Sequence, residues 1–265
     1  MEVYEPLLFY RPLKNKERLQ VLQRSLNCKF TPRMSWRLNS NGGKHISQCI
    51  KNIPKEGRSC FPSDELVQKH RDKCKNNCFT VVKELTKRLP GKTMSSLLPL
   101  ISDPTIDTDV RLLHVVRDPR ASLNSAIKLG WMSDYKERNF NPTVQSYCEE
   151  IFQNIKFGQK LKAPLKHKYR LILYRDIAAR PFDTAREIFK FVGLDLSQKT
   201  VQWILNMTSH KTVEAKKDSG APYSLVRDSE ANIDKWRSES PPERTRIIEK
   251  VCQPLLKLIE EISSG

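Results

Sequence analysis

The distribution of apolar and polar residues along the chain predicts short strands that alternate with amphipathic helices. Short apolar runs predict strands at residues 79–85, 111–116 and 169–174. Apolar residues at helical spacing predict helices at 11–27, 94–101, 119–131, 142–161, 181–192, 197–206 and 242–262. The segments 28–78 and 208–240 are polar and irregular. Alternating strands and helices predict an α/β fold whose parallel sheet is built with right-handed crossovers.

The segment Leu112–Ser125 predicts a strand, a sharp turn and a helix. Its four apolar residues between 112 and 116 suit a covered parallel strand. Asp118 suits the N-cap of the helix that follows, and Pro119 suits the first helical position. Arg117 then lies at the carboxyl end of a strand, beside the free N–H groups and the positive dipole end of a helix. This combination of groups favours phosphate binding.

The predicted helix after this turn carries two different faces. Ser122 and Ser125 follow Asp118 at helical spacing, so their hydroxyls project from one side. Leu123, Ile127 and Trp131 form a separate apolar stripe that is expected to pack against a sheet. The motif taken alone also fits a charged, solvated turn with a local ion pair.

The segment Arg117–Ala121, with Ser125 eight residues after Arg117, resembles the 3′-phosphate-binding motif of sulfotransferases. It is similar to the version in the Golgi carbohydrate sulfotransferases, which sulfate galactose, N-acetylglucosamine or N-acetylgalactosamine at the 6-hydroxyl. The resemblance implies that Arg117 and Ser125 bind the 3′-phosphate of the donor, 3′-phosphoadenylyl sulfate (PAPS).

Other segments resemble the same family in the same order along the chain. They are Tyr4–Leu7, Phe79–Lys83, Ser102–Pro104, Leu171–Ala178, Phe189–Leu194, Val226–Ser229 and Lys235–Arg237. The resemblance implies a P-loop-like parallel sheet flanked by helices, the sulfotransferase fold. It extends over most of the chain, which is therefore expected to form one domain over 1–265. Within that domain, 28–78 would be a polar, cysteine-containing insertion.

The resemblance also assigns roles to residues outside the turn. Glu5 matches a carboxylate that faces the donor sulfur in the family, so it is the candidate general base; an ordinary ion pair or cap is the alternative. Arg227, Trp236 and Arg237 lie in a closing segment that would cover the donor. For Trp236, the alternative role of a buried core anchor is favoured by its aromatic character.

One departure from the family pattern precedes all of these matches. In the family, a Gly/Ser-rich loop that holds the 5′-phosphosulfate lies about twenty residues before the Tyr-Glu-Pro segment. Here that segment begins at Tyr4, and no other Gly-rich loop follows an apolar strand. We therefore expect an amino-terminally incomplete sulfotransferase that lacks its first strand and phosphosulfate loop. Such a chain is expected to be poorly stable and unable to catalyse transfer.

The charge balance indicates an anionic partner. The 265-residue chain carries a formal net charge of +17, which suits a polyphosphate donor, a sulfated glycan or proteoglycan acceptor, or nucleic acid. No aromatic and basic motif of a known nucleic-acid module is present, so nucleic acid is the weakest candidate. A non-catalytic protein that binds anions or glycans stays open as an alternative to an active enzyme.

Cellular location follows from the resemblance alone, which implies the Golgi lumen. No stretch approaches the ~20 apolar residues that span a bilayer, and Met1-Glu2 does not begin a signal peptide. The five histidines are dispersed and the cysteines lack paired CxxC spacing, so no metal site is predicted. Four of the seven cysteines fall between Cys49 and Cys78, where one or two disulfides are expected in an oxidising lumen, and reduced thiols otherwise. Asn206-Met207-Thr208 is an N-glycosylation sequon, relevant only in that compartment.

Overall fold

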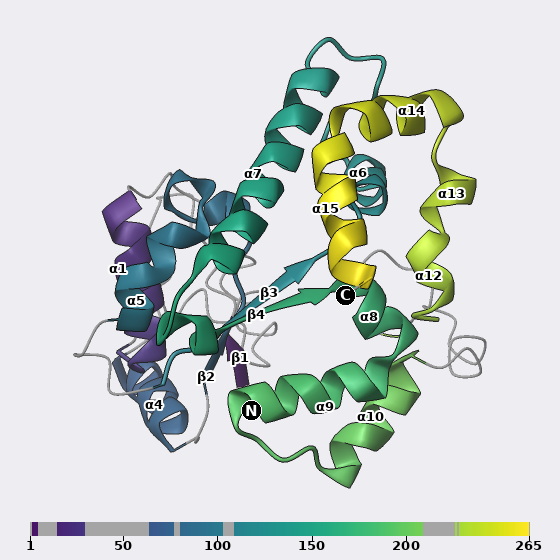
Figure 1. Ribbon diagram of the computed structural model, residues 1–265. Coiled ribbons are helices and arrows are strands. Elements are labelled where there is room, and N and C mark those ends of the chain that lie inside the picture. Colours follow the sequence, from purple (N-terminus) through teal and green to yellow (C-terminus); the bar gives the residue numbers. More distant parts are fainter. Residues whose placement is uncertain are drawn as a thin grey trace, which may run out of the picture. The chain divides into compact units, whose positions relative to one another are not determined.

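The computed structural model describes residues 2–4, 15–29, 64–76, 80–102, 109–208, 226 and 228–264, with the backbone alone at 2–4, 15–16, 64–66, 70 and 73 (Figure 1). These residues belong to two compact units, Met1–Val110 and Arg111–Gly265. The organisation of the chain as one domain over 1–265 stays a prediction.

The first unit combines a pair of short strands with two disulfide-linked helices. Its elements are β1 (Glu2–Tyr4), α1 (Asn15–Leu26), α4 (Asp64–Lys75), β2 (Thr80–Val82), the 3-10 helices η1 (Thr86–Arg88), η2 (Pro90–Lys92) and η3 (Met94–Leu97), and α5 (Leu98–Ser102). β1 pairs with β2 in parallel, with Val3 opposite Val81. Residues 2–4 are a strand that the sequence pattern does not predict, and α4 is a regular helix inside the segment expected to be irregular.

A disulfide between Cys28 and Cys74 connects the end of α1 to α4. Both cysteines are buried and pack with Val67 and the partly buried Val21. Disulfides are expected from the sequence among the four cysteines from Cys49 to Cys78. Cys74 does form a disulfide, but its partner, Cys28, lies before that cluster in the sequence. The other three cysteines of the cluster lie outside the described residues.

The second unit contains the predicted strand–turn–helix. Its elements are β3 (Leu112–Val116), α6 (Pro119–Lys128), α7 (Phe140–Lys160), η4 (Leu165–Lys168), β4 (Tyr169–Leu173), α8 (Tyr174–Ala179), α9 (Pro181–Val192), α10 (Gln198–Thr208), α12 (Ala231–Asp234), α13 (Trp236–Glu239), α14 (Pro242–Val251) and α15 (Gln253–Ser264). β3 and β4 pair in parallel, with Val116 opposite Leu173. The connection between them passes through α6 and α7, which confirms the predicted α/β class with parallel strands (Figure 1).

The core of this unit lies between the strand pair and helices α6, α7, α14 and α15. Val116 and Leu173 contribute from the strands, while Leu123, Ile155 and Ile248 contribute from three of the helices. In Figure 1 the long helix α7 runs beside α15, and the two helices are in contact. A second disulfide, Cys148–Cys252, lies inside this core and joins α7 to the junction of α14 and α15. The sequence pattern does not predict this pairing.

Two predictions about buried surfaces are wrong. Leu113 and Val115 are 39% and 52% exposed, because alternate residues of β3 face opposite sides and only His114 and Val116 point into the core. Trp131 is 58% exposed rather than part of the helical stripe. The helix ends at Lys128, and the turn at Gly130, with φ +69°, directs the chain away before Trp131 is reached.

Several boundaries also differ from the sequence-based prediction. The closing helix is interrupted at Cys252, directly before the segment Gln253-Pro254, because proline lacks the N–H that a continuous helix needs. Two short helices, α12 and α13, lie within the segment expected to be a loop. By contrast, the predicted bounds of α9 are confirmed: Pro181 starts the helix and Gly193 ends it in the left-handed conformation.

No helix among the described residues is long and apolar enough to cross a membrane. Asn206 of the sequon is exposed near the end of α10, where its side chain accepts a hydrogen bond from Gln202.

Candidate functional site

The turn between β3 and α6 adopts the geometry expected from its sequence. The Asp118 side chain caps α6 by accepting a hydrogen bond from the Arg120 N–H at 2.8 Å, and Pro119 occupies the first turn, where no N–H is required. Arg117 is the last residue before this cap. It therefore follows the buried Val116 and precedes the amino-terminal end of a ten-residue helix.

Arg117 lies over an aromatic ring and is only partly satisfied by hydrogen bonds. Its guanidinium carbon is 4.4 Å from the centre of the Tyr174 ring. Its Nη2 donates to the backbone carbonyl of Asn232 at 3.3 Å. Its Nε is buried and has no hydrogen-bond partner within the described part of the chain. A buried, unpaired guanidinium N–H is costly, so Nε is the donor of Arg117 that a bound anion would satisfy.

The contact between Arg117 and Tyr174 follows from the pairing of the two strands. Val116 is opposite Leu173 in the parallel register, so the next residue of each strand emerges at the same edge. Ligand sites of open α/β sheets form at this carboxyl edge. Tyr174 is not among the site residues predicted from the sequence, although its position as the last residue of the predicted strand 169–174 is a signal that could have identified it.

Ser122 and Ser125 both lie on α6 and are partly buried. The Ser122 side chain shares a hydrogen bond with the hydroxyl of Tyr147 on α7. Burial raises the pKa of Tyr147 above its usual value, and the nearby positive charge of Arg117 opposes this rise. The structure therefore brings Ser122, Tyr147 and Arg117 close together, while Ser125 follows one helical turn beyond Ser122.

Trp236 and Arg237 are placed in contact with the second arginine of the turn. Trp236 is buried at 4% exposure, as favoured by the core-anchor alternative. Its ring contacts two guanidinium groups, with Arg120 at 4.5 Å and Arg237 at 4.6 Å from the ring centre. Arg237 is exposed and donates to Asp234 at 2.9 Å.

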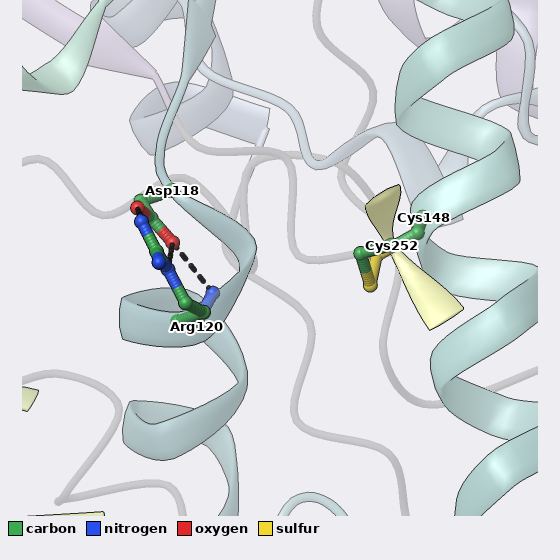
Figure 2. Close-up of a disulfide and its surroundings, with 4 residues drawn as sticks. All are labelled: Asp118, Arg120, Cys148 and Cys252. Atoms are coloured by element: carbon green, nitrogen blue, oxygen red, sulfur yellow. Dashed lines mark hydrogen bonds and ion pairs between the residues drawn. A yellow bond between two sulfur atoms is a disulfide. The ribbon is translucent and has the colours of Figure 1, made fainter. Parts of the chain in front are cut away.

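Arg120 connects the turn to the closing helices. It forms a two-point ion pair with Asp118, drawn in Figure 2, and donates to Glu249 of α14 at 2.8 Å. A second, more deeply buried arginine, Arg244, donates to Asn124 at 2.6 Å and so joins α14 to α6. These contacts fix the segment that carries Trp236 against the helix that begins at the candidate site.

Beneath the turn, a buried histidine forms a hydrogen bond with a tyrosine of the neighbouring strand. His114 Nδ1 and the Tyr169 hydroxyl are 2.9 Å apart. Burial lowers the pKa of His114 from 6.5 to about 4, so the ring is neutral near pH 7. Burial also raises the pKa of Tyr169. This pair supports the strands rather than the chemistry, because it lies inside the sheet and not at its carboxyl edge.

Two predicted site residues, Glu5 and Arg227, lie outside the described residues, so their roles stay predictions. Among the residues that the structure describes, no group of three or more His, Cys, Asp or Glu side chains is arranged to hold a metal ion.

Comparisons with known proteins show which family the chain resembles. Residues 26–260 match the family model described as "Sulfotransferase domain". The chain is 31% identical over 179 residues to carbohydrate sulfotransferase 3 of Mus musculus, an alignment covering 63% of this chain and 36% of that protein. It is 28% identical over 197 residues to carbohydrate sulfotransferase 1 of Danio rerio, covering 70% of this chain and 44% of that one. The chain thus spans less than half the length of these curated relatives.

A search of solved structures finds the sulfotransferase domain of the Synechococcus PCC 7002 olefin synthase. It is 15% identical, with a TM-score of 0.44, over 92% of this chain and 80% of that one.

Proposed function

Because the chain belongs to the sulfotransferase family, we propose that it is a PAPS-dependent enzyme that transfers a sulfo group to a glycan hydroxyl. The observation that carries this proposal is the buried Arg117 Nε without a partner in the described residues, at the carboxyl edge of a parallel strand. A nucleotide 3′-phosphate would supply the missing acceptor oxygen there. Ser125 would donate a second hydrogen bond from α6.

The proposed reaction is an in-line displacement at sulfur. The acceptor hydroxyl oxygen bonds to sulfur while the bond from sulfur to the 5′-phosphate oxygen breaks, which releases 3′,5′-adenosine bisphosphate (PAP). The hydroxyl proton passes to a general base, for which Glu5 is the candidate, and positive groups stabilise the departing phosphate. Arg237 and Arg227 would form the cover over the donor, and the buried Trp236 would anchor this segment through its contact with Arg237.

The proposed acceptor is a glycan or proteoglycan, modified at the 6-hydroxyl of a hexose or hexosamine. Its support is the likeness to carbohydrate sulfotransferases 1 and 3 together with the net charge of +17, which attracts sulfated or carboxylated glycans. Identifying the sulfated carbon in the product of an acceptor-panel assay by mass spectrometry would test this choice. Sulfation only at secondary hydroxyls would contradict it.

We place the protein in the Golgi lumen. The support is the likeness to these relatives, together with the disulfides Cys28–Cys74 and Cys148–Cys252 of the described residues, because disulfides persist in oxidising compartments. Imaging of the tagged protein beside a Golgi marker tests this proposal, and a cytosolic signal would contradict it.

Titration with nucleotides tests the donor site without requiring turnover. PAP and 5′-AMP differ by the 3′-phosphate alone, so the ratio of their dissociation constants measures the contribution of that phosphate. We expect Arg117→Ala to weaken PAP binding roughly 10- to 100-fold, as for loss of a charged hydrogen bond, and to leave 5′-AMP nearly unchanged. Ser125→Ala should produce a smaller effect in the same direction.

Arg186→Ala is the matched control, because it removes one positive charge from an exposed ion pair with Asp183 on α9. Its PAP and 5′-AMP affinities should equal those of the parent chain. An Arg117→Ala variant that keeps the parent's preference for PAP over 5′-AMP would refute the assigned role.

A further inference from the structure

Tyr174 and Asn232 form a support around the guanidinium of Arg117. The Tyr174 ring covers one face of the guanidinium at 4.4 Å. The Asn232 carbonyl accepts from Nη2 at the edge of the same group. The Asn232 side-chain amide donates to the Tyr174 hydroxyl at 2.7 Å, so the two supporting residues are also bonded to each other. The ring contact and the hydrogen bond together restrict the motion of the Arg117 guanidinium.

The support is itself attached to the structure on two sides. Tyr174 begins α8 directly after β4, where the pairing of Val116 with Leu173 determines its position. Asn232 lies on α12, whose preceding turn is bonded back to α8 through the Ser229 hydroxyl, which donates to the Ala178 carbonyl at 2.8 Å. The support therefore joins the segment before Trp236 to the strand edge that carries Arg117.

This arrangement decides which donors of Arg117 remain available. Nη2 is engaged by Asn232 and the ring covers one face, whereas Nε is buried without a partner among the described residues. An arginine side chain has several rotatable bonds, and fixing them costs conformational entropy on binding unless they are already held. A guanidinium held before the ligand arrives binds it with less of this cost.

We propose that Tyr174 and Asn232 are positioning residues, which hold Arg117 in the orientation that binds the 3′-phosphate. In this role Tyr174 acts on the phosphate through Arg117. This inference rests on the proposed function, because it assumes that Arg117 binds the nucleotide.

The alternative roles make different predictions. A residue that only stabilises the fold would change PAP and 5′-AMP affinity together. A residue that contacts the nucleotide directly would also affect both ligands, and would do so whether or not Arg117 is present. A residue that acts through Arg117 affects the phosphate-dependent part of binding alone, and its effect disappears when Arg117 is removed.

The test is a double-mutant cycle on the full 265-residue chain with PAP and 5′-AMP as probes. We expect Tyr174→Leu to weaken PAP binding roughly 5- to 30-fold, the range of a partly desolvated cation–π contact, with little change for 5′-AMP. Tyr174→Phe keeps the ring and should retain most of the PAP affinity. Asn232→Ala removes the same hydrogen bond from the other side, so it should match Tyr174→Phe, and the two combined should add little.

In the Arg117→Ala background, Tyr174→Leu should cause no further loss of PAP affinity. Phe191→Leu is the control: it removes a different arginine–aromatic contact, with Arg111, and should leave the PAP to 5′-AMP ratio unchanged. An unchanged ratio in Tyr174→Leu, or a loss that persists in the Arg117→Ala background, would overturn the inference while Arg117 keeps its role. Failure of the parent chain to bind PAP would instead defeat the proposed function itself.

Discussion

Three residues at the end of β3 lie in different surroundings although they are close in sequence. His114 is buried against Tyr169, Val116 is in the hydrophobic core, and Arg117 lies at the strand edge over the ring of Tyr174. Alternation along the strand places His114 and Val116 on the same face. Arg117 follows the last residue of the strand and therefore does not take part in this alternation. The candidate site is therefore built on a rigid element whose own stability depends on a neutral histidine.

Burial of His114 makes the stability of the second unit depend on pH. The pKa of His114 is about 4 when folded and about 6.5 when unfolded, so the unfolded chain binds more protons between these values. The contribution of the neutral ring is present above pH 6.5 and is lost as the pH falls through 6 and 5 toward 4. The loss approaches about 3 kcal/mol at most.

Urea unfolding at pH 7.5 and pH 5 measures this effect. We expect His114→Gln to be less stable than the parent at pH 7.5 but to lose less further stability at pH 5. Carboxylates elsewhere titrate equally in both proteins, so the difference between the two pH slopes isolates His114. Parallel slopes would show that the histidine does not carry the dependence.

Gly158 of α7 is required by the ring of Tyr169. A Cβ at this position would overlap the end of that ring, and the ring cannot easily move because it is buried and bonded to His114. Gly158→Ala should therefore destabilise the fold by roughly 1–3 kcal/mol, although alanine is the better helix former. Tyr169→Leu in the same chain should remove the penalty of the alanine. Chemical unfolding of both single variants and the pair checks this, and additive losses would argue against the overlap.

At the scale of elements, the end of α14 and the start of α6 are joined through Arg120. This side chain bonds to Asp118 and Glu249 and covers one face of Trp236. Arg237 also lies against this ring, and it forms an ion pair with the exposed Asp234. The two arginines therefore provide an internal comparison between a partly buried contact and an exposed one.

We expect Arg120→Met to lower the free energy of unfolding by about 1–3 kcal/mol, since it leaves Asp118 and Glu249 without their partner. Arg237→Ala should cost less than about 0.5 kcal/mol, as is usual for exposed ion pairs. Thermal unfolding monitored by circular dichroism compares the two. Equal effects would mean that Arg120 does not hold the helices together.

The sequence predicts those elements whose local signals agree with their final packing. The strand–turn–helix around Asp118 and the bounds of α9 follow from capping and proline chemistry, which act within a few residues. The break at Cys252 has a local signal in Pro254, which the apolar spacing obscures. The exposure of Leu113 and Val115 could not be predicted, because the hydrophobicity of a strand does not reveal whether helices pack on one face of its sheet or on both.

The residues of the candidate site also divide into those that have a local sequence signal and those that do not. Arg117 and Ser125 are identified from a short motif, whereas Tyr174 and Asn232 are not. Asn232 is 115 residues from Arg117 in the sequence, and it reaches the guanidinium only after the closing segment has packed on α8. A contact between residues so far apart in the sequence leaves no local sequence pattern. For Tyr174 there is a partial signal, because the pairing of the two strands brings it to the same sheet edge as Arg117.

At the scale of the whole molecule, the Cys148–Cys252 disulfide closes a loop of 104 residues within one core. Loop closure of this length removes much of the conformational freedom of the unfolded chain. The combined substitution of both cysteines by alanine should lower the free energy of unfolding by roughly 3–5 kcal/mol.

Tryptophan fluorescence during chemical unfolding measures this loss, since three of the four tryptophans lie within Arg111–Gly265. A reducing agent should narrow the difference between the two unfolding midpoints, because it cleaves Cys148–Cys252 in the parent alone and Cys28–Cys74 in both proteins. Equal stability of the two proteins without reductant would contradict the expected contribution of the crosslink.

The same covalent link determines how the protein behaves after proteolysis. Tyr174, Asn232 and Trp236 all lie between the two linked cysteines, and Arg117 lies before them. A protease that cuts once between Cys148 and Cys252 would leave two pieces still attached to each other. Such a nicked protein would migrate as one band on a non-reducing gel and as two after thiol treatment, and it could retain its nucleotide site after the backbone is broken.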